Sequence, residues 1–61
     1  MNDKIIFDYY EKGYRLYHVD YSGEEQYLGR IRHYSLSTAM WFYRLEGIDT
    51  EIGERYAGIS A

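Results

Sequence analysis

Side chains that could perform catalysis are few in this sequence. His18 and His33 are its only imidazoles, and two histidines without a third ligand make a poor zinc site. Ser35, Ser37 and Thr38 lie together, but no serine has a histidine and an acid at a recognisable spacing, as a nucleophile requires. Glycine-rich phosphate-binding motifs are missing, and 61 residues give little depth in which to raise a carboxyl pKa. We therefore predict a protein that is not an enzyme and holds no metal ion or cofactor.

Arginine and tyrosine are the more informative residue types. The chain has nine Tyr against two Phe and one Trp. Arg and Tyr are enriched at protein interfaces, because each covers apolar area while keeping polar reach. The same pair stacks on nucleobases and contacts phosphates. We predict a partner-binding face formed by Tyr10, Arg15, Tyr17, Tyr21, Arg30, Arg32, Tyr34 and Arg44. Alternatively, the arginine stems simply cover exposed rings.

A second candidate site is acidic. It consists of four carboxylates within nine residues, namely Glu46, Asp49, Glu51 and Glu54. Such a run could imitate the phosphates of DNA and engage a basic nucleic-acid-binding protein, although charge runs are usually solvated chain ends. The net charge of −3 and the pI of about 5.2 argue against a general nucleic-acid binder. A protein partner is therefore favoured over nucleic acid.

Strands must position these side chains. Three segments are rich in β-branched and aromatic residues and bounded by turn signals, and they are residues 4–10, 14–21 and 26–34. We predict a two-residue hairpin turn at Lys12-Gly13, with Gly13 at positive φ, and a four-residue turn over residues 22–25. Gly29 interrupts the third strand and could mark a β-bulge.

Turn lengths fix which residues share a face of the sheet, because side chains alternate along a strand. The expected core face contains Ile5, Phe7, Tyr9, Leu16, Tyr27 and Ile31, with Trp41, Tyr43 and Leu45 from a fourth strand. The opposite face carries the arginines and tyrosines, with Asp8 and Phe42. This register also places Arg15 opposite Arg32, and like charges opposed across a sheet are destabilising. Either an anion binds there or the true register differs.

Residues 35–46 fit two structures. A helix would begin at Ser35 or Ser37 and end at Gly47, with one apolar face made of Leu36, Ala39, Met40 and Tyr43. A strand over residues 39–46 suits three consecutive aromatic residues better and is favoured. A helix would cover the core face within the chain. A strand would leave that face to a second copy, so we expect a homodimer.

The predicted fold is a single domain over residues 1–61, mainly β, with an antiparallel meander of three to four strands. The alternative is an α+β fold, a three-stranded antiparallel sheet covered by a helix at about residues 36–46. Residues 48–61 would add a short edge strand or an acidic end. No apolar run approaches the ~18 residues of a membrane span, and no signal sequence is visible. We therefore expect a cytoplasmic protein without a membrane partner.

In general type, the chain resembles small phage-encoded inhibitors of host defence or transcription, anti-CRISPR and anti-restriction proteins among them. The features that carry the resemblance are short length, absence of Cys and Pro, many tyrosines and an acidic balance. No motif matches, so no residue role is carried over. The resemblance implies stoichiometric blockade of a larger host protein by steric occlusion or DNA mimicry.

Overall fold

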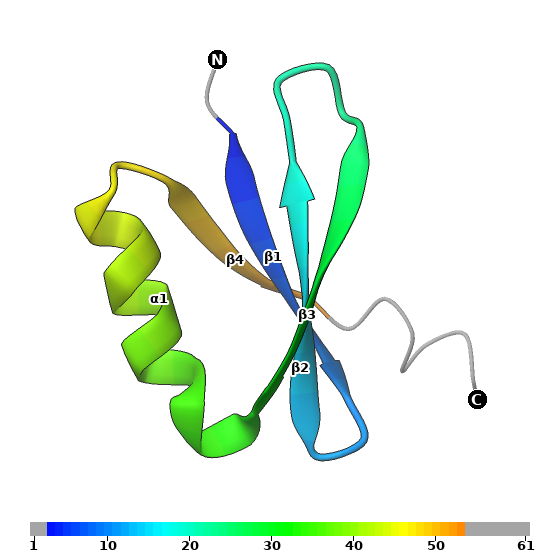
Figure 1. The fold of residues 1–61 in the computed structure, drawn as a ribbon, viewed down its shortest axis with the longest axis vertical. Helices are drawn as coiled ribbons and strands as arrows, with labels where there is room; N and C mark the ends of the chain where they lie inside the picture. The colour runs from blue at the N-terminus through cyan, green and yellow to red at the C-terminus, as the bar shows by residue number, and fades with distance from the viewer. Residues whose placement is uncertain (1–2, 54–61) are drawn as a thin grey trace.

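The structure is a computed structural model that describes residues 3–53, and it shows a four-stranded sheet with one helix (Figure 1). The elements in chain order are β1 (Lys4–Tyr10), β2 (Gly13–Val19), β3 (Glu25–Arg32), a 3-10 turn η1 (His33–Ser35), α1 (Leu36–Leu45) and β4 (Asp49–Gly53). The strand order in the sheet is β3-β2-β1-β4. The prediction of a small β-rich fold is confirmed, in the form that includes a helix.

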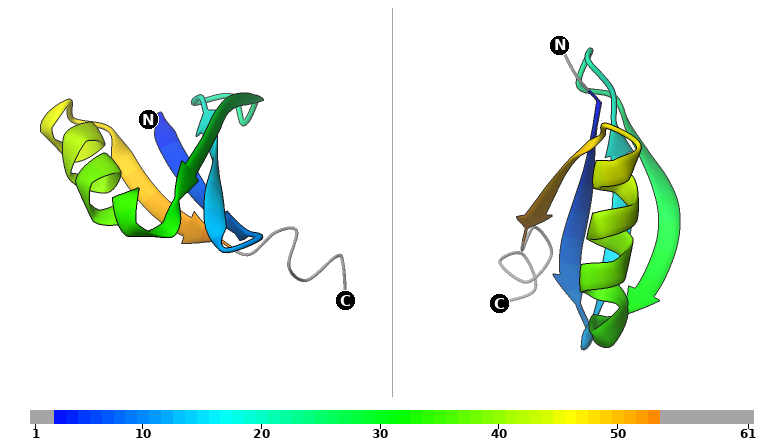
Figure 2. Two further views of the ribbon diagram at one scale, coloured as in Figure 1. Left: turned by 60° about the horizontal axis from the view of Figure 1, so that its bottom comes forward. Right: turned by 90° about the vertical axis from the view of Figure 1, so that its left-hand side faces the viewer.

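Two kinds of connection build the sheet. Strands β1, β2 and β3 form an antiparallel meander, whereas β4 pairs with β1 in parallel. The chain leaves β3 at one edge, crosses one face of the sheet as α1, and returns as β4 at the other edge (Figures 1 and 2). A short edge strand in the tail is therefore confirmed at Asp49–Gly53.

The helix α1 corrects the strand that we favoured over residues 39–46. Its apolar spacing matches the helical alternative, because residues three and four apart share a helix face. The residues that pack on the buried core of Ile5, Phe7 and Leu16 include the predicted face, namely Leu36, Ala39, Met40 and Tyr43. The Tyr43 ring meets the Phe7 ring edge-on, with centroids 6.1 Å apart. Packing of this face outweighs the modest cost of placing aromatic residues in a helix.

The end of α1 gives a second reason for the helix. Gly47 adopts a left-handed φ of 80°, the conformation that glycine adopts most easily after a helix. Its N–H donates to the carbonyl of Arg44 at 3.0 Å, and the Ile48 N–H donates to the carbonyl of Tyr43 at 3.0 Å. These two bonds form a Schellman motif. Gly47 thus ends α1 as the helical alternative predicted.

The turn between β1 and β2 lies one residue earlier than predicted. Glu11 and Lys12, not Gly13, adopt positive φ, at 49° and 61°. Gly13 instead begins β2, where a Cβ atom would lie 2.7 Å from the Ile31 carbonyl oxygen. The turn shifts the β1–β2 pairing by two residues, so that Phe7 lies opposite Leu16 rather than His18. A shift of two preserves the face of every side chain.

The bulge predicted near Gly29 is present and changes the face of one residue. The β2–β3 register shifts between Leu16, which pairs with Gly29, and Tyr17, which pairs with Tyr27. Gly29 adopts a φ of 142°. The extra residue on β3 moves Tyr27 from the expected core face to the opposite face. It also places Arg15 opposite Arg30, not Arg32.

The helix changes the rest of the predicted core. Trp41 and Leu45, expected in the core, are 62% and 65% exposed, because α1 turns them away from the sheet. Tyr9 is 39% exposed and contacts the Tyr14 ring edge-on. The face of the sheet directed away from α1, called the far face below, has a buried cluster of its own, made of Ile6, Tyr17 and Val19.

Within residues 3–53, no helix has the length and apolar character that crossing a membrane requires. The homodimer was predicted from a strand over residues 39–46. Because α1 covers the core face of the sheet from within the chain (Figure 2), this face does not require a second copy.

Candidate binding surfaces

Arg30, a central member of the predicted binding face, holds the β1–β2 turn. Its Nη2 atom donates to the carbonyl oxygens of Tyr10 at 3.2 Å and Glu11 at 2.6 Å. Its Nη1 atom lies 3.5 Å from the Glu11 carboxylate. Carbonyls at a turn made of two left-handed residues need donors, and Arg30 supplies them. This side chain therefore has a structural task.

Arg15 and its neighbours on the far face also contact one another. The Arg15 guanidinium carbon lies 3.5 Å from the centroid of the Tyr10 ring, a close cation–π contact. Tyr17 is only 8% exposed, and its ring packs on the Tyr27 ring at 5.5 Å. Asp8, on the same face and opposite Arg15 in the register, is fully buried. These contacts match the alternative in which arginine stems cover tyrosine rings.

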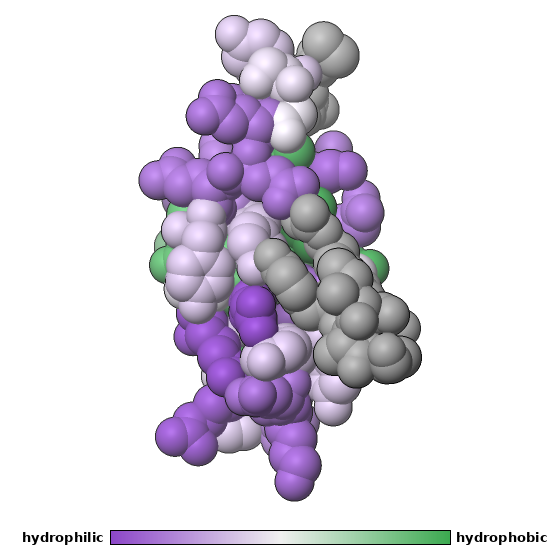
Figure 3. All heavy atoms as spheres, turned by 90° about the vertical axis from the view of Figure 1, so that its right-hand side faces the viewer, coloured by the Kyte–Doolittle hydropathy of each residue, from purple (hydrophilic) through white to green (hydrophobic). Residues whose placement is uncertain are grey.

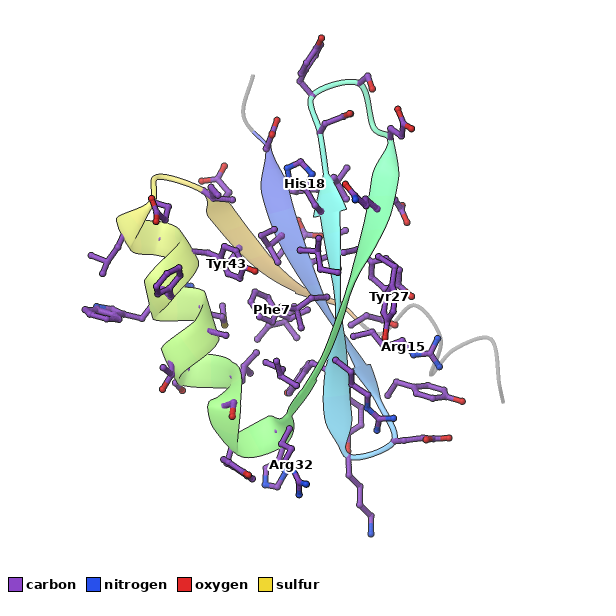
Figure 4. All side chains as sticks on the ribbon, in the orientation of Figure 1. Phe7, Arg15, His18, Tyr27, Arg32 and Tyr43 are labelled. Atoms are coloured by element: carbon purple, nitrogen blue, oxygen red, sulfur yellow. The ribbon has the colours of Figure 1, made fainter. Side chains whose placement is uncertain are left out.

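The other predicted binding residues are scattered. Tyr21, 69% exposed, lies in the β2–β3 turn, and Tyr34, 70% exposed, lies in η1. Arg44 lies on α1, where its Nε atom donates to the Thr50 hydroxyl at 3.0 Å. Figure 4 shows Arg15 and Tyr27 on the far side of the sheet from α1, and Arg32 at the end where β3 meets η1. The predicted set does not form one surface.

The acidic residues of the second candidate site likewise lie at separate places in the fold. Glu46 is the C-cap residue of α1, and exposed Asp49 begins β4. Glu51 accepts a hydrogen bond from the Lys4 ammonium at 3.1 Å, so a base on the neighbouring strand partly neutralises it. Glu54 lies outside the described residues.

The sequence reasoning missed an exposed apolar surface on α1. Side chains on the helix side opposite the core are Trp41, Phe42 and Leu45, which are 62%, 58% and 65% exposed. Leu45 lies three residues after Phe42 and four after Trp41, so it is a neighbour of both on the helix surface. The signal was available: in the helical alternative Trp41, Phe42 and Leu45 lie outside the apolar face predicted for the helix, and large apolar residues on the exposed side of a helix often mark an interaction surface.

A groove links this apolar surface to Tyr34. It has a volume of about 520 Å³ and lies where α1 and η1 face β2 and β3. Most of its lining is apolar, and the lining residues are Leu16, Ile31, Tyr34, Ser35, Thr38, Ala39, Phe42 and Tyr43. We use the name apolar groove for this feature. Phe42 belongs both to the groove and to the exposed surface of α1.

A basic hollow adjoins the apolar groove. It has a volume of about 520 Å³ and lies between the β1–β2 turn and the end of β3. Its lining residues are Glu11, Lys12, Gly13, Arg30, Ile31, Arg32, His33 and Tyr34. Among residues 3–53, Arg30 pairs with Glu11, while no acidic side chain pairs with Lys12 or Arg32. Ile31 and Tyr34 line both the groove and the hollow.

The far face offers a different surface. Most residues of this face are coloured as hydrophilic in Figure 3, and the most hydrophilic ones lie near the β1–β2 turn, at the lower end of the molecule in Figure 1. No group of three or more histidine, aspartate or glutamate side chains in the described part of the chain could hold a metal ion. His18 makes a single side-chain contact with Asp3 at 2.9 Å.

Asp20 organises the turn that precedes β3. Its Oδ1 atom accepts hydrogen bonds from the Ser22 hydroxyl at 2.6 Å, the Ser22 N–H at 2.9 Å and the Glu24 N–H at 3.0 Å. The Ser22 hydroxyl is the main cause that lowers the pKa of Asp20 below its usual value, and the two backbone donors add to this effect. Its carboxylate is therefore part of the turn rather than a free acid for chemistry.

Comparison with known proteins identifies no relative of this chain. No family model, no curated protein and no solved structure matches the chain.

Proposed function

We propose that this protein is a non-enzymatic protein-interaction module that binds its partner through α1 and the apolar groove. One observation carries the proposal: α1 and the adjoining η1 carry an exposed apolar band, made of Tyr34, Trp41, Phe42 and Leu45, each more than half exposed, and Tyr34 and Phe42 also line the groove. An aromatic side chain offers about 150–250 Å², so at these exposed fractions the band presents roughly 500 Å². That matches the largest apolar patches of monomers, about 300–600 Å² and often functional.

The band is large enough to anchor an interface. A standard interface covers about 800 Å² on each partner, with a central aromatic cluster and a polar rim. The four side chains would supply more than half of that area. The rim would come from Ser37 and Thr38, which are exposed on α1 between the apolar residues. Binding by this surface needs no catalytic group, and it would let the protein block a larger partner by covering its site.

Of the partners considered, this geometry favours a protein over nucleic acid. Stacking on bases needs exposed rings beside accessible arginines. On the far face Tyr17 is buried, Arg30 is hydrogen bonded to two backbone carbonyls, and Arg15 lies over Tyr10. A sheet-type nucleic-acid binder therefore remains the weaker candidate. Salt-sensitive binding of single-stranded oligonucleotides would support it.

The proposal is tested by photocrosslinking in extracts of cells that carry the protein. A photoreactive phenylalanine analogue replaces Phe42 in one variant and Tyr21 in a control variant, where Tyr21 is 69% exposed in the β2–β3 turn. We expect a defined crosslinked protein band from position 42 and none from position 21. Equal crosslinking from both positions, or crosslinking from position 21 alone, would contradict the proposal.

A further inference from the structure

The apolar groove and the basic hollow meet at Ile31 and Tyr34. This junction places an apolar surface directly beside Lys12 and Arg32, which make no ion pair within residues 3–53, on a protein whose net charge is −3. We propose that the two features together bind a peptide segment in which an apolar side chain lies close to carboxylates. The inference rests on the proposed function and specifies the chemistry of the partner.

The charge of the hollow is the first reason. Lys12, Arg30 and Arg32 face a single carboxylate, that of Glu11, which pairs with Arg30. Lys12 and Arg32 make no ion pair within the described residues, and both are exposed. Electrostatic complementarity between interfaces requires acidic groups opposite such a pair.

The shape of the hollow is the second reason. Gly13 forms part of its wall, and a Cβ atom there would lie 2.7 Å from the Ile31 carbonyl oxygen and 3.4 Å from the Arg30 Nε atom. The left-handed backbone at Glu11 and Lys12 turns the chain beside this wall. The basic side chains are thus carried by a tight hairpin and by the end of a paired strand, rather than by a loose loop.

The position of the groove sets the spacing in the peptide. The groove and the hollow meet at Ile31 and Tyr34, so ligand side chains in the two would lie on the order of 10 Å apart, and an extended chain advances ~3.3 Å per residue. An apolar residue in the groove and a carboxylate in the hollow are therefore about three residues apart. β3 is an edge strand, so its outer backbone groups can hydrogen-bond an extended segment that lies alongside.

Two other ligands could occupy the groove and the hollow, namely a single-stranded nucleic acid and a second copy of the chain. A phosphate-rich ligand such as a single-stranded oligonucleotide would use the basic hollow without the apolar residues of the groove. A second copy of the chain would need the same surface twice. The combination of charge with a groove lined mainly by apolar side chains favours the acidic-apolar peptide.

The inference is tested with a displayed library of random twelve-residue peptides, selected on the immobilised full chain. We expect the selected peptides to place Asp or Glu about three residues from Leu, Phe or Trp. A Lys12→Glu/Arg32→Glu variant should lose these peptides by roughly tenfold or more in affinity, because like charges would then oppose each other. The same selection on that variant should enrich Lys or Arg in place of the acids.

Matched controls separate the possible failures. The variant Lys4→Glu reverses one charge at a different hollow, where Asp49 and Glu51 are also present, and it should keep the selected peptides, whereas the single variant Lys12→Glu should weaken their binding. A Phe42→Ser variant should lose them. If Phe42→Ser loses the peptides while Lys12→Glu/Arg32→Glu retains them, the charge inference fails and the proposed function stands.

The remaining outcomes also decide the question. Peptides without an acidic bias, or no enrichment at all, would overturn the inference. So would binding of a labelled single-stranded oligonucleotide that depends on Lys12 and Arg32 in the absence of peptide binding. Far-UV circular dichroism and thermal unfolding of each variant show whether the fold is retained.

Discussion

Lys12 adds positive charge to the basic hollow at a cost in stability. Its φ of 61° lies in the left-handed region, which costs a non-glycine residue about 1–2 kcal/mol. The natural choice for the second position of such a turn is glycine. A lysine that occupies it adds a charge to the basic hollow that glycine cannot provide.

The substitution Lys12→Gly should therefore stabilise the fold. We expect the free energy of unfolding to rise by about 0.5–1 kcal/mol, since glycine removes the left-handed strain but adds some unfolded-state entropy. Urea denaturation measures the change. A Lys12→Ala variant keeps the strain and serves as the control. Equal stabilities of the glycine and alanine variants would contradict the strain at this position.

Asp20 predicts a defined dependence of stability on pH. Because hydrogen bonds in the fold lower its pKa below the usual 3.8, the folded state binds the ionised form more strongly than the unfolded chain does. This contribution is complete above the unfolded pKa and is lost as the pH falls through the folded pKa. Asp20→Ala should therefore lower the melting temperature at about pH 7, and the difference from the natural chain should shrink toward about pH 2.

An Asp20→Asn variant tests the origin of that dependence. The amide oxygen still accepts hydrogen bonds from backbone N–H groups, but it does not titrate. We expect this variant to keep part of the turn's stability with less pH dependence. A loss in Asp20→Ala that stays constant from neutral to acidic pH would show that the carboxylate charge has no part in it.

At the scale of elements, the strands were more predictable than the helix. The three segments of the meander followed from β-branched and aromatic runs between turn residues, and the bulge followed from Gly29. The register did not, because Glu11 and Lys12 adopt positive φ without the sequence signal of Asn or Gly. The faces predicted for the residues of β1 and β2 are still correct, because the predicted register was off by two residues and a shift of two preserves the face.

The helix was obscured by Trp41, Phe42 and Tyr43. Consecutive aromatic residues favour a strand when local propensity is considered alone. Tertiary contacts decide otherwise, since Tyr43 packs on Phe7 while Trp41 and Phe42 stay exposed. The candidate site was missed for the same reason: a strand would place Trp41 on the core face and Phe42 on the opposite face, whereas the helix leaves both exposed.

Because one side of α1 packs on the core and the other is exposed, substitutions on the two sides should differ strongly in their cost to stability. Tyr43→Ala removes a half-buried ring that packs on the core and should cost about 2–3 kcal/mol of stability, somewhat less than truncation of a fully buried aromatic residue. Trp41→Ala removes a ring that is 62% exposed and should change stability by less than about 0.5 kcal/mol. Thermal or urea unfolding gives both values. Similar losses in the two variants would mean that the helix faces are wrongly assigned.

At the scale of the whole molecule, the helix determines how the sheet is covered. α1 packs on the sheet face that contains Phe7, and the far face buries Ile6, Tyr17 and Val19. The fold therefore does not need a second copy to cover its core, unlike a sheet of strands alone. The exposed apolar band of α1 then stands out as surface that folding of residues 3–53 does not use.

We accordingly expect the isolated protein to be monomeric at micromolar concentration. The band offers roughly 500 Å² by the estimate from side-chain areas, below the ~800 Å² per partner of a standard interface. Sedimentation equilibrium measures the mass, and a Trp41→Ser variant is the control. A stable dimer that dissociates in this variant would identify α1 as a self-association surface.

The most direct test of the interaction surface uses the only tryptophan in the chain. Once crosslinking from position 42 has identified the partner, Trp41 emission and the Kd are measured as that partner is added to the natural chain, to Phe42→Ser and to Tyr21→Ser. We predict that binding shifts Trp41 emission to shorter wavelength, that Phe42→Ser weakens the Kd by roughly tenfold or more, and that Tyr21→Ser leaves it unchanged. Unchanged Trp41 emission with equal affinities for both variants would contradict a binding role for α1.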